Sequence, residues 1–351
     1  SNTVPPAVVG AVQACLGRLA ETTELRDKLE ANTMRFREAM TTALYSHPAC
    51  VGHAVPAGHP ECPDRLRAIE GALNAPGFAG LLRLEAPEVP EAALGRAHDR
   101  AYLDALAAAI PARGLRALDA DTHVGPGALG AARRAAGAVT AAVDLVMGGG
   151  AANAFCAVRP PGPHAERARA MGFCLYANAA IGALHALDHH GAGRVAVVDF
   201  DVHHGNGTQD VLWHERRALF FSSHQMPLWP GTGEASEQGA HGQIVNLPLA
   251  PGSDGAAMRA LYAAHVLPRL RAFAPDLIIV SAGFDAHRAD PLAGLRWDEG
   301  DFAWLTRAIC AVARDVCAGR VVSVLEGGYD LPSLGASVAA HVAELIAGGA
   351  G

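Results

Sequence analysis

The sequence lacks the features that mark several specialised classes of protein. Its seven cysteines are odd in number and scattered, with no Cys-x-x-Cys pair, which indicates a reducing compartment and not a disulfide framework. The Gly148-Gly149-Gly150 run has no GxGxxG or Walker pattern around it, so nucleotide binding is not expected. We identify no signal peptide and no apolar run long enough to span a membrane, and therefore expect a cytoplasmic protein.

The charge also excludes some partners. The 351 residues carry a formal net charge of -7 and no long basic run, so neither nucleic acid nor an acidic membrane surface is an expected partner. Half of the residues are hydrophobic, which is enough for one large α/β domain or two smaller ones.

Short apolar segments alternate with helical patterns along most of the chain. Because the apolar segments are rich in Val, Ile and Leu without polar alternation, they predict an α/β fold with an open, mainly parallel central sheet and helices on both faces. The predicted strands are residues 154–159, 194–201, 218–223, 243–249, 276–282 and 320–325. The predicted helices are residues 129–147, 175–189, 255–273, 301–318 and 333–346.

The first 39 residues differ in character from the rest. Leu16, Leu19, Leu25 and Leu29 fall near helical spacing with charges between them, so residues 1–39 are predicted to be an appended helical segment. Ser1-Asn2 without an initiator Met is typical of a cleaved purification tag. Such a segment can pack on its own domain or on another copy of the chain, which leaves a homo-oligomer open.

The most informative stretch is an apolar run, 195–198, that ends in acidic and imidazole side chains. Asp199, Asp201 and His203 alternate there, and side chains two apart in a strand face the same side. Burying three such polar groups without partners is costly, so the pattern favours metal ligands at the rim of a sheet over a plain polar turn.

Polar or glycine-rich loops follow three further predicted strands. They are residues 159–164, 283–287 and 326–329. Any one of these could be a structural loop. Because sites in open α/β sheets form beyond the carboxyl ends of the strands, four such loops together favour one shared site.

A series of motifs in these loops carries a resemblance to a known family. They are His59-Pro60-Glu61-Cys62-Pro63-Asp64-Arg65-Leu66, Asp121-Thr122, Arg159-Pro160-Pro161-Gly162-x-His164-Ala165-Glu166, Met171-Gly172-Phe173-Cys174, Asp199-x-Asp201-x-His203-His204-Gly205-Asn206-Gly207-Thr208-Gln209, Ser281-Ala282-Gly283-Phe284-Asp285 and Glu326-Gly327-Gly328-Tyr329. From about His47 onward the chain resembles the zinc-dependent histone deacetylase superfamily, in particular its class II and bacterial amidohydrolase-like members. The resemblance implies the arginase/deacetylase fold and a single catalytic domain over residues 40–351.

The resemblance also implies a metal centre and a reaction. It assigns Asp201, His203 and Asp285 as ligands of one catalytic Zn²⁺, a set that leaves room for water and substrate. Taken alone, Asp285 would be interpreted as a helix cap. The implied reaction is hydrolysis of N-acyl amides, with acetyl-lysine-like substrates favoured, in which water bound to the metal attacks the acyl carbon.

Two residues are implied to act directly on the substrate. His164 would be the general base and then the acid, and Tyr329 would donate its hydroxyl to the oxyanion. The family usually has two consecutive histidines where this chain has Pro163-His164, so the first is missing. Asn206 matches the partner of the catalytic histidine, and an amide there favours a lower His164 pKa than a carboxylate would.

The resemblance assigns further residues to a potassium site and to a substrate channel. Asp199, which would also support the metal centre, and Ser222 match an internal K⁺ site. Channel positions match Phe173, Trp229, Leu292, His224 and Thr122, with Asp121 at the rim and with His59 and Arg65 in the floor of the site. Polyamine-specific relatives can carry a glutamate at the position of Leu292, so the leucine favours acyl-lysine-like substrates.

Four alternatives stay open from sequence alone. The chain could be an acetylpolyamine amidohydrolase, or a weakly active acyl-lysine binder because of Pro163. It could also be a binuclear manganese ureohydrolase on the same fold, which metal counting would separate, or a plain structural domain whose polar loops are caps and turns.

Overall fold

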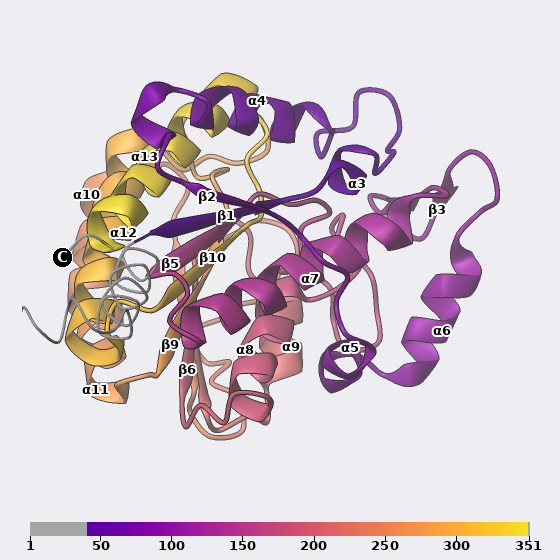
Figure 1. The fold of residues 1–351 in the computed structure, drawn as a ribbon. Helices are drawn as coiled ribbons and strands as arrows, with labels where there is room; N and C mark the ends of the chain where they lie inside the picture. Colours follow the sequence, from indigo (N-terminus) through magenta and orange to yellow (C-terminus); the bar gives the residue numbers. More distant parts are fainter. Residues whose placement is uncertain (1–40, 350–351) are drawn as a thin grey trace, which may run out of the picture.

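The computed structural model describes residues 41–349, and in that part of the chain eight strands form one parallel sheet (Figure 1). The spatial order is β2-β1-β5-β10-β9-β6-β7-β8. The strands are β1 (Thr42–Ser46), β2 (Leu82–Glu85), β5 (Asn153–Cys156), β6 (Val195–Asp199), β7 (Ala218–Gln225), β8 (Ile244–Leu249), β9 (Leu277–Ala282) and β10 (Val321–Leu325). Two short segments, β3 (Arg116–Ala117) and β4 (His123–Val124), form a separate antiparallel pair. The predicted segment 1–39 lies outside the described residues.

Long helices cover both faces of the sheet, as the sequence predicted. α7 (Ala128–Met147) and α8 (Asn178–Asp188) pack on one face, and α12 (Glu299–Cys317) and α13 (Leu331–Gly349) pack on the other. The remaining α-helices of the described residues are α3 (Pro48–Val51), α4 (Asp64–Leu73), α5 (Glu91–Ala97), α6 (Arg100–Ala109), α9 (Asn206–Leu212), α10 (Gly255–Leu261) and α11 (Leu267–Phe273), and η1 (Pro76–Phe78) is a short 3₁₀-helix.

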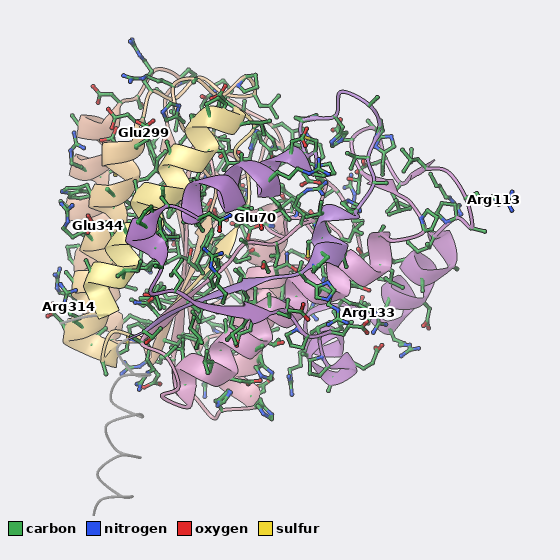
Figure 2. All side chains as sticks on the ribbon, turned by 45° about the horizontal axis from the view of Figure 1, so that its top comes forward. Glu70, Arg113, Arg133, Glu299, Arg314 and Glu344 are labelled. Atoms are coloured by element: carbon green, nitrogen blue, oxygen red, sulfur yellow. The ribbon has the colours of Figure 1, made fainter. Side chains whose placement is uncertain are left out.

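Sequence chemistry explains this layering. The central strands β6, β9 and β10 are buried along their whole length, which suits their runs of Val, Ile and Leu. Charged side chains such as Glu70 on α4 and Arg314 on α12 lie on the outer surface of the helical layers (Figure 2). The start of α12 is fixed by a capping box, in which Asp298 and Asp301 each accept from the other's backbone N–H.

Differences from the predicted elements lie at the ends and at the sheet edge. The strand predicted over 154–159 ends at Cys156, and the helix predicted over 175–189 begins at Asn178. The helix predicted over 255–273 contains a π-helical turn at Tyr262–Val266, directly before Pro268, which cannot donate a backbone hydrogen bond. Strands β1 and β2 were not predicted, because β1 (Thr-Ala-Leu-Tyr-Ser) has no Val or Ile and β2 alternates Leu with Arg and Glu at the edge.

One expectation about apolar segments was wrong. By length and composition alone, α13 is apolar enough to cross a membrane. In the fold, Leu334, Val338 and Leu345 of this helix are buried, and the helix packs against α12, α4 and the sheet. Its apolar character is therefore accounted for by its place in the core.

Candidate active site

The acidic and imidazole residues after β6 fold into a tight, buried loop. The strand ends at Asp199, so Asp201 and His203 lie in the following loop, not in the strand as the alternation suggested. The Asp201 N–H donates to Asp199 Oδ1 at 3.0 Å, and the His203 N–H donates to Asp201 Oδ1 at 2.9 Å. Each carboxylate thus holds the backbone of the next polar residue, which fixes the direction of all three side chains.

His203 meets two carboxylates from different loops. Its Nδ1 lies 3.1 Å from Asp201 Oδ1 and 3.1 Å from Asp285 Oδ2, and Asp285 comes from the loop after β9. Asp285 Oδ1 accepts the Val202 N–H at 2.9 Å, so Asp285 is anchored toward this point and is not a helix cap. Zinc–ligand bonds of about 2.0 Å in a tetrahedron put neighbouring ligand atoms about 3.3 Å apart, close to the observed spacing. Both distances to His203 are therefore compatible with ligation of one such ion.

Two glycines allow the carboxylates to approach so closely. A Cβ at Gly283 would lie 2.2 Å from Asp201 Oδ2, and a Cβ at Gly327 would lie 2.1 Å from Asp285 Oδ2. The Gly327 N–H donates to Asp201 Oδ2 at 2.8 Å. Any larger residue at either position would displace a carboxylate, so the glycines after β9 and β10 belong to the construction of the site.

The electrostatics of this point favour a positive charge. Burial alone would lower the pKa of His203, but the Asp201 and Asp285 carboxylates raise it to about 10. Burial raises the pKa of Asp285 to about 7, with the nearby Asp201 adding to the shift. A buried pair of carboxylates that has only one imidazole between them is the chemistry of a cation site.

His164 lies beside this centre with a defined tautomer. Nitrogen and oxygen atoms of His164, Asp201 and His203 lie within 4.8 Å of one another. His164 Nδ1 is 3.0 Å from Asn206 Oδ1, and Asn206 Nδ2 donates to Glu166 Oε1 at 2.9 Å. Because the amide oxygen only accepts, Nδ1 of His164 carries the proton and Nε2 keeps its lone pair. Burial lowers the pKa of His164 to about 4, so the ring is neutral near pH 7.

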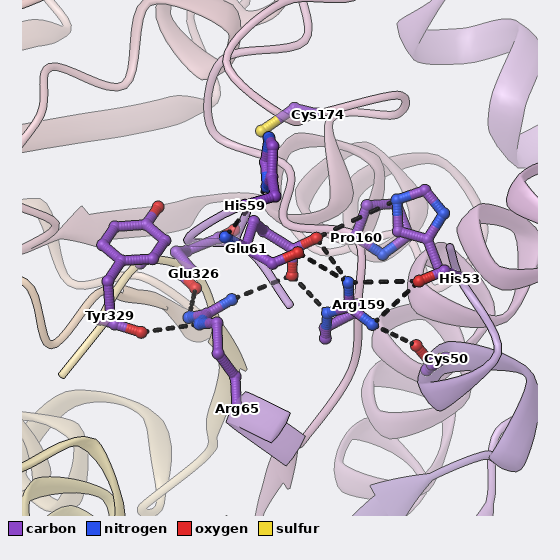
Figure 3. Close-up of polar contacts among 12 residues, drawn as sticks. Cys50, His53, His59, Glu61, Arg65, Arg159, Pro160, Cys174, Glu326 and Tyr329 are labelled. Atoms are coloured by element: carbon purple, nitrogen blue, oxygen red, sulfur yellow. Dashed lines mark hydrogen bonds and ion pairs between the residues drawn. The ribbon is translucent and has the colours of Figure 1, made fainter. Parts of the chain in front are cut away.

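A buried ionic network supports Tyr329 (Figure 3). Glu61 lies between Arg65 and Arg159, and all three side chains are fully buried. Arg65 Nε donates to the Gly328 carbonyl at 2.6 Å, and its guanidinium carbon lies 5.0 Å from the centre of the Tyr329 ring. The Tyr329 N–H donates to Asp290 Oδ2 at 2.7 Å. Tyr329 is therefore held from both its backbone and its ring face, and the predicted place of Arg65 in the site floor agrees with this network.

Glu326 joins three of the site loops and was not assigned a role from the sequence. Its Oε1 accepts from Ser281 Oγ and its Oε2 from the Gly162 N–H, both at 2.8 Å. Burial raises the pKa of this carboxyl to about 8. Its position directly after β10 was visible in the sequence, but these contacts depend on the neighbouring loops.

A cavity of about 280 Å³ opens above the centre. It is lined by Asp121, His164, Gly172, Phe173, His203, Leu228, Trp229, Leu292 and Tyr329. The Trp229 ring centre is 4.7 Å from that of His164 in an edge-to-face arrangement. Phe173, Trp229 and Leu292 thus occupy the wall positions expected of them.

Two predicted channel residues lie elsewhere. Thr122 is fully buried behind the wall, where its hydroxyl accepts the Phe173 N–H at 3.2 Å. His224 is also buried, with Nδ1 at 3.0 Å from Ser222 Oγ and Nε2 at 3.0 Å from the Gly233 carbonyl. Neither residue is among those that line the cavity, so both interpretations as lining residues are corrected: each side chain makes a buried contact within the protein instead.

The predicted potassium position contains an unsatisfied acceptor. Asp199 is fully buried, and its Oδ2 has no hydrogen-bond partner in the described part of the chain. Asp199 is in register with Ser222 on β7, and a Cβ at Gly205 would lie 2.3 Å from Asp199 Oδ2. Only a glycine at position 205 therefore leaves room for this carboxylate oxygen.

Comparison with known proteins agrees with this architecture. The family model described as the histone deacetylase domain matches residues 59–345. The chain belongs to the histone deacetylase family. The "Histone deacetylase-like amidohydrolase" of Pseudomonas aeruginosa is 39% identical, over 78% of this chain and 73% of that protein. The human "Polyamine deacetylase HDAC10" is 36% identical, over 88% of this chain and 48% of that protein.

The fold is that of the same family. The crystal structure of the HDA15 HD domain superposes with a TM-score of 0.83 at 35% sequence identity, covering 88% of this chain and 89% of that chain. The eight-stranded parallel sheet with helices on both faces is thus the arginase/deacetylase fold, as expected from the motifs. Relatives that carry deacetylase names support a deacetylase-type hydrolase.

Proposed function

We propose that the chain is a zinc-dependent amidohydrolase that removes acetyl and related acyl groups from lysine-like amines. The observation that carries the proposal is the convergence of Asp201 and Asp285 on one nitrogen of His203, each at 3.1 Å. Two carboxylates and an imidazole at ligand spacing suit Zn²⁺ and leave a coordination position open. When bound, zinc acts as a Lewis acid that polarises the acyl carbonyl and makes water more acidic.

His164 would handle the protons of the reaction. Asn206 holds its Nδ1–H, so Nε2 is the atom that takes a proton from the attacking water and returns it to the departing amine. The pKa of about 4, caused by burial, keeps Nε2 unprotonated and ready as a base. Pro163 replaces the first histidine that the family usually has, but it leaves this pairing in place, which favours an active enzyme over a mere binder.

Tyr329 would stabilise the negative charge that develops on the acyl oxygen. It lines the cavity with His164 and His203, so its hydroxyl belongs to the same space as the reacting carbonyl. Burial raises the pKa of Tyr329 well above its usual value, so the phenol keeps its proton and can donate it in a hydrogen bond. The Arg65 contact and the Asp290 hydrogen bond hold the residue in position.

The walls of the cavity favour a methylene chain. Phe173, Leu228 and Leu292 are apolar, and Trp229 presents an aromatic surface next to His164. A lysine side chain that carries an acyl group has four methylenes, which such walls can hold by apolar burial. Acetylpolyamine hydrolysis is the second candidate, because one relative is named a polyamine deacetylase and Asp121 places a carboxylate in the lining.

The remaining assignments belong to the same proposal. Asp199 and Ser222 would hold a structural K⁺, supported by the unpartnered Asp199 Oδ2. The substrate would be an acyl amide on a small molecule or peptide, handled in the cytoplasm without nucleic acid or membrane as partner. Assembly into a homo-oligomer through residues 1–39 stays a prediction.

The test combines metal analysis with a substrate panel. Zinc-loaded protein should hydrolyse acetyl-lysine peptides faster than acetylspermidine or acetylputrescine, and Asp285→Asn should lose both catalytic zinc and turnover. Preference for the acetylpolyamines would favour the second candidate. Two manganese ions bound at the Asp201–Asp285 site, with hydrolysis of a guanidino substrate, would contradict the proposal in favour of a ureohydrolase.

A further inference from the structure

A second cluster of metal-ligating side chains lies far from the active site in the topology. It consists of Asp144 on α7 with His185, His189 and His190 at the carboxyl end of α8. The loop that follows leads into the first residue of β6, whereas Asp199 and the catalytic centre lie beyond its other end. The two clusters are therefore at opposite ends of the same strand.

The four side chains converge on a common point. One ligand atom from each lies within 4.8 Å of all the others. Asp144 Oδ1 lies 2.6 Å from His185 Nε2 and 2.7 Å from His190 Nε2, so a single oxygen faces two imidazoles. The His189 ring stacks on that of His185, with centres 4.6 Å apart.

The spacing of the residues explains how they meet. His185 and His189 are four residues apart on the last turn of α8, so they share one face, and His190 follows where the helix has ended. Asp144 is on the neighbouring helix α7, which packs along α8. His185 is buried and its Nδ1 has no hydrogen-bond partner among the described residues, so Nε2 alone fixes this ring.

Two members of the cluster have pKa shifts that suit metal ligands. Burial lowers the pKa of His185 despite the nearby Asp144, so this imidazole is neutral near pH 7. Burial acts to raise the pKa of Asp144, but hydrogen bonds from His190 and His185 hold it below its usual value. His185 and Asp144 are thus in the uncharged and the ionised form, respectively, which are the forms that bind a cation.

We propose that Asp144, His185, His189 and His190 form a second zinc site, which fastens the end of α8 to α7. Three imidazoles and one carboxylate suit four-coordinate Zn²⁺. Binding requires the Asp144 oxygen to move away from the two Nε2 atoms, from 2.6–2.7 Å to a ligand spacing of about 3.3 Å. The Asp144 side chain is 50% exposed and has room for this movement.

The test counts zinc on untagged protein that has been stripped with a chelator and titrated with Zn²⁺. Wild type should bind two equivalents with submicromolar affinity, whereas His189→Ala/His190→Ala should bind one and keep its deacetylase activity. His214→Ala/His241→Ala is the matched control, because these histidines are also exposed but lie outside the cluster. The control should still bind two equivalents.

A variant that lacks a catalytic ligand separates zinc binding at this site from zinc binding at the catalytic site. In Asp285→Asn the cluster should still bind one equivalent, and zinc should raise the melting temperature of that variant by mass action. Adding His189→Ala/His190→Ala should abolish both effects. Equal zinc binding by Asp285→Asn with and without the histidine substitutions would overturn the proposal, as would failure of Asp285→Asn to bind zinc below about 10 μM. Neither result depends on whether the enzyme turns over an acyl amide.

Discussion

At the scale of single residues, the chemistry depends on which atom of His164 is free. Asn206 orients the ring through Nδ1 and is itself oriented by Glu166, since its amide donates to that carboxylate. This chain of contacts supports the role proposed for His164, that of a neutral base through Nε2. An amide partner does not stabilise the imidazolium, in contrast to a carboxylate.

The pH dependence of the enzyme tests this pairing. Asn206→Asp should raise the pKa of His164 from about 4, because the new carboxylate favours the protonated ring. Since kcat/KM requires the neutral ring, the acidic limb of its pH profile should move to higher pH in the variant. The measurement is the kcat/KM profile of both proteins from about pH 5 to 9, where wild type should stay on its plateau and an acidic limb should enter the range only in the variant. An unmoved acidic limb would assign that limb to another group.

Removal of one hydroxyl tests the role of Tyr329. Tyr329→Phe should lower kcat by about 10²–10³-fold, the cost of losing one oxyanion donor, while KM changes little. The ring contact with Arg65 and the Asp290 hydrogen bond are kept in the variant, so its melting temperature should stay near that of wild type. A rise in KM without a fall in kcat would show that the hydroxyl binds the substrate in its ground state instead.

Single residues also show where sequence reasoning reached its limit. That the loops of Asp201, His203 and Asp285 lie together could be predicted because they follow strands, where a parallel sheet collects its loops, but the role of Asp285 was implied only by the family resemblance. The places of Thr122 and His224 could not be predicted, because the direction of a loop side chain depends on partners distant in the chain, here Phe173 and Gly233. The contacts of Glu326 with the loop after β5 and with Ser281 near the end of β9 were hidden for the same reason.

At the scale of elements, the site depends on glycines in the loops that follow β9 and β10.

The apolar runs of the sequence predicted the buried strands, but the predicted ends of these strands were less accurate. The strand before Arg159 ends three residues early, at Cys156, because local pattern does not show where pairing with β1 and β10 stops. Neither β1 nor the edge strand β2 stands out in the sequence, because β1 (Thr-Ala-Leu-Tyr-Ser) has no Val or Ile and β2 alternates Leu with charged residues.

Substitution of one loop glycine tests this construction. Gly283→Ala places a Cβ 2.2 Å from Asp201 Oδ2 and 2.6 Å from its Cα, so the Asp201 carboxylate must move. We expect zinc affinity at the catalytic centre to fall by about 10–100-fold, as for other changes that disturb ligand orientation. Zinc titration monitored by competition with a chromophoric chelator measures this.

The matched control for that experiment is Gly130→Ala. Gly130 lies within α7, and a Cβ there would have no atom of the described residues within 4 Å. Alanine is the better helix former by about 1 kcal/mol, so this variant should gain stability and keep wild-type zinc affinity. Equal zinc affinity of Gly283→Ala and Gly130→Ala would contradict the close-packed arrangement around Asp201.

At the scale of the whole molecule, buried histidines tie the layers together and make stability depend on pH. His341 on α13 is an example remote from the metal centre. Its Nδ1 is 2.6 Å from Thr306 Oγ1 on α12, and its Nε2 is 2.8 Å from Ser323 Oγ on β10. The Thr306 hydroxyl already donates to the Phe302 carbonyl, so it accepts the proton of Nδ1, and Nε2 accepts from Ser323. The ring fits this place only in its neutral form.

The consequence is a loss of stability in mild acid. Burial lowers the pKa of His341 to about 3 and those of His53 and His98 to about 4, compared with 6.5 for an ordinary histidine. Below pH 6.5 the unfolded chain binds protons that the native protein does not, so the free energy of unfolding falls as the pH falls toward the folded-state values. Each such histidine contributes a slope of about 1.4 kcal/mol per pH unit within that window.

His341→Gln tests this on one residue, because the amide keeps a donor and an acceptor but cannot titrate. Between pH 6.5 and 4.5 the unfolding free energy of the variant should fall less steeply than that of wild type, by the slope of one proton. Urea unfolding at several pH values in that window measures it. Zinc release in acid is common to both proteins and cancels when their unfolding free energies are subtracted. Equal pH slopes of the two unfolding free energies would contradict the prediction. They would mean that His341 is protonated in the native core or that the unfolded chain does not take up the proton.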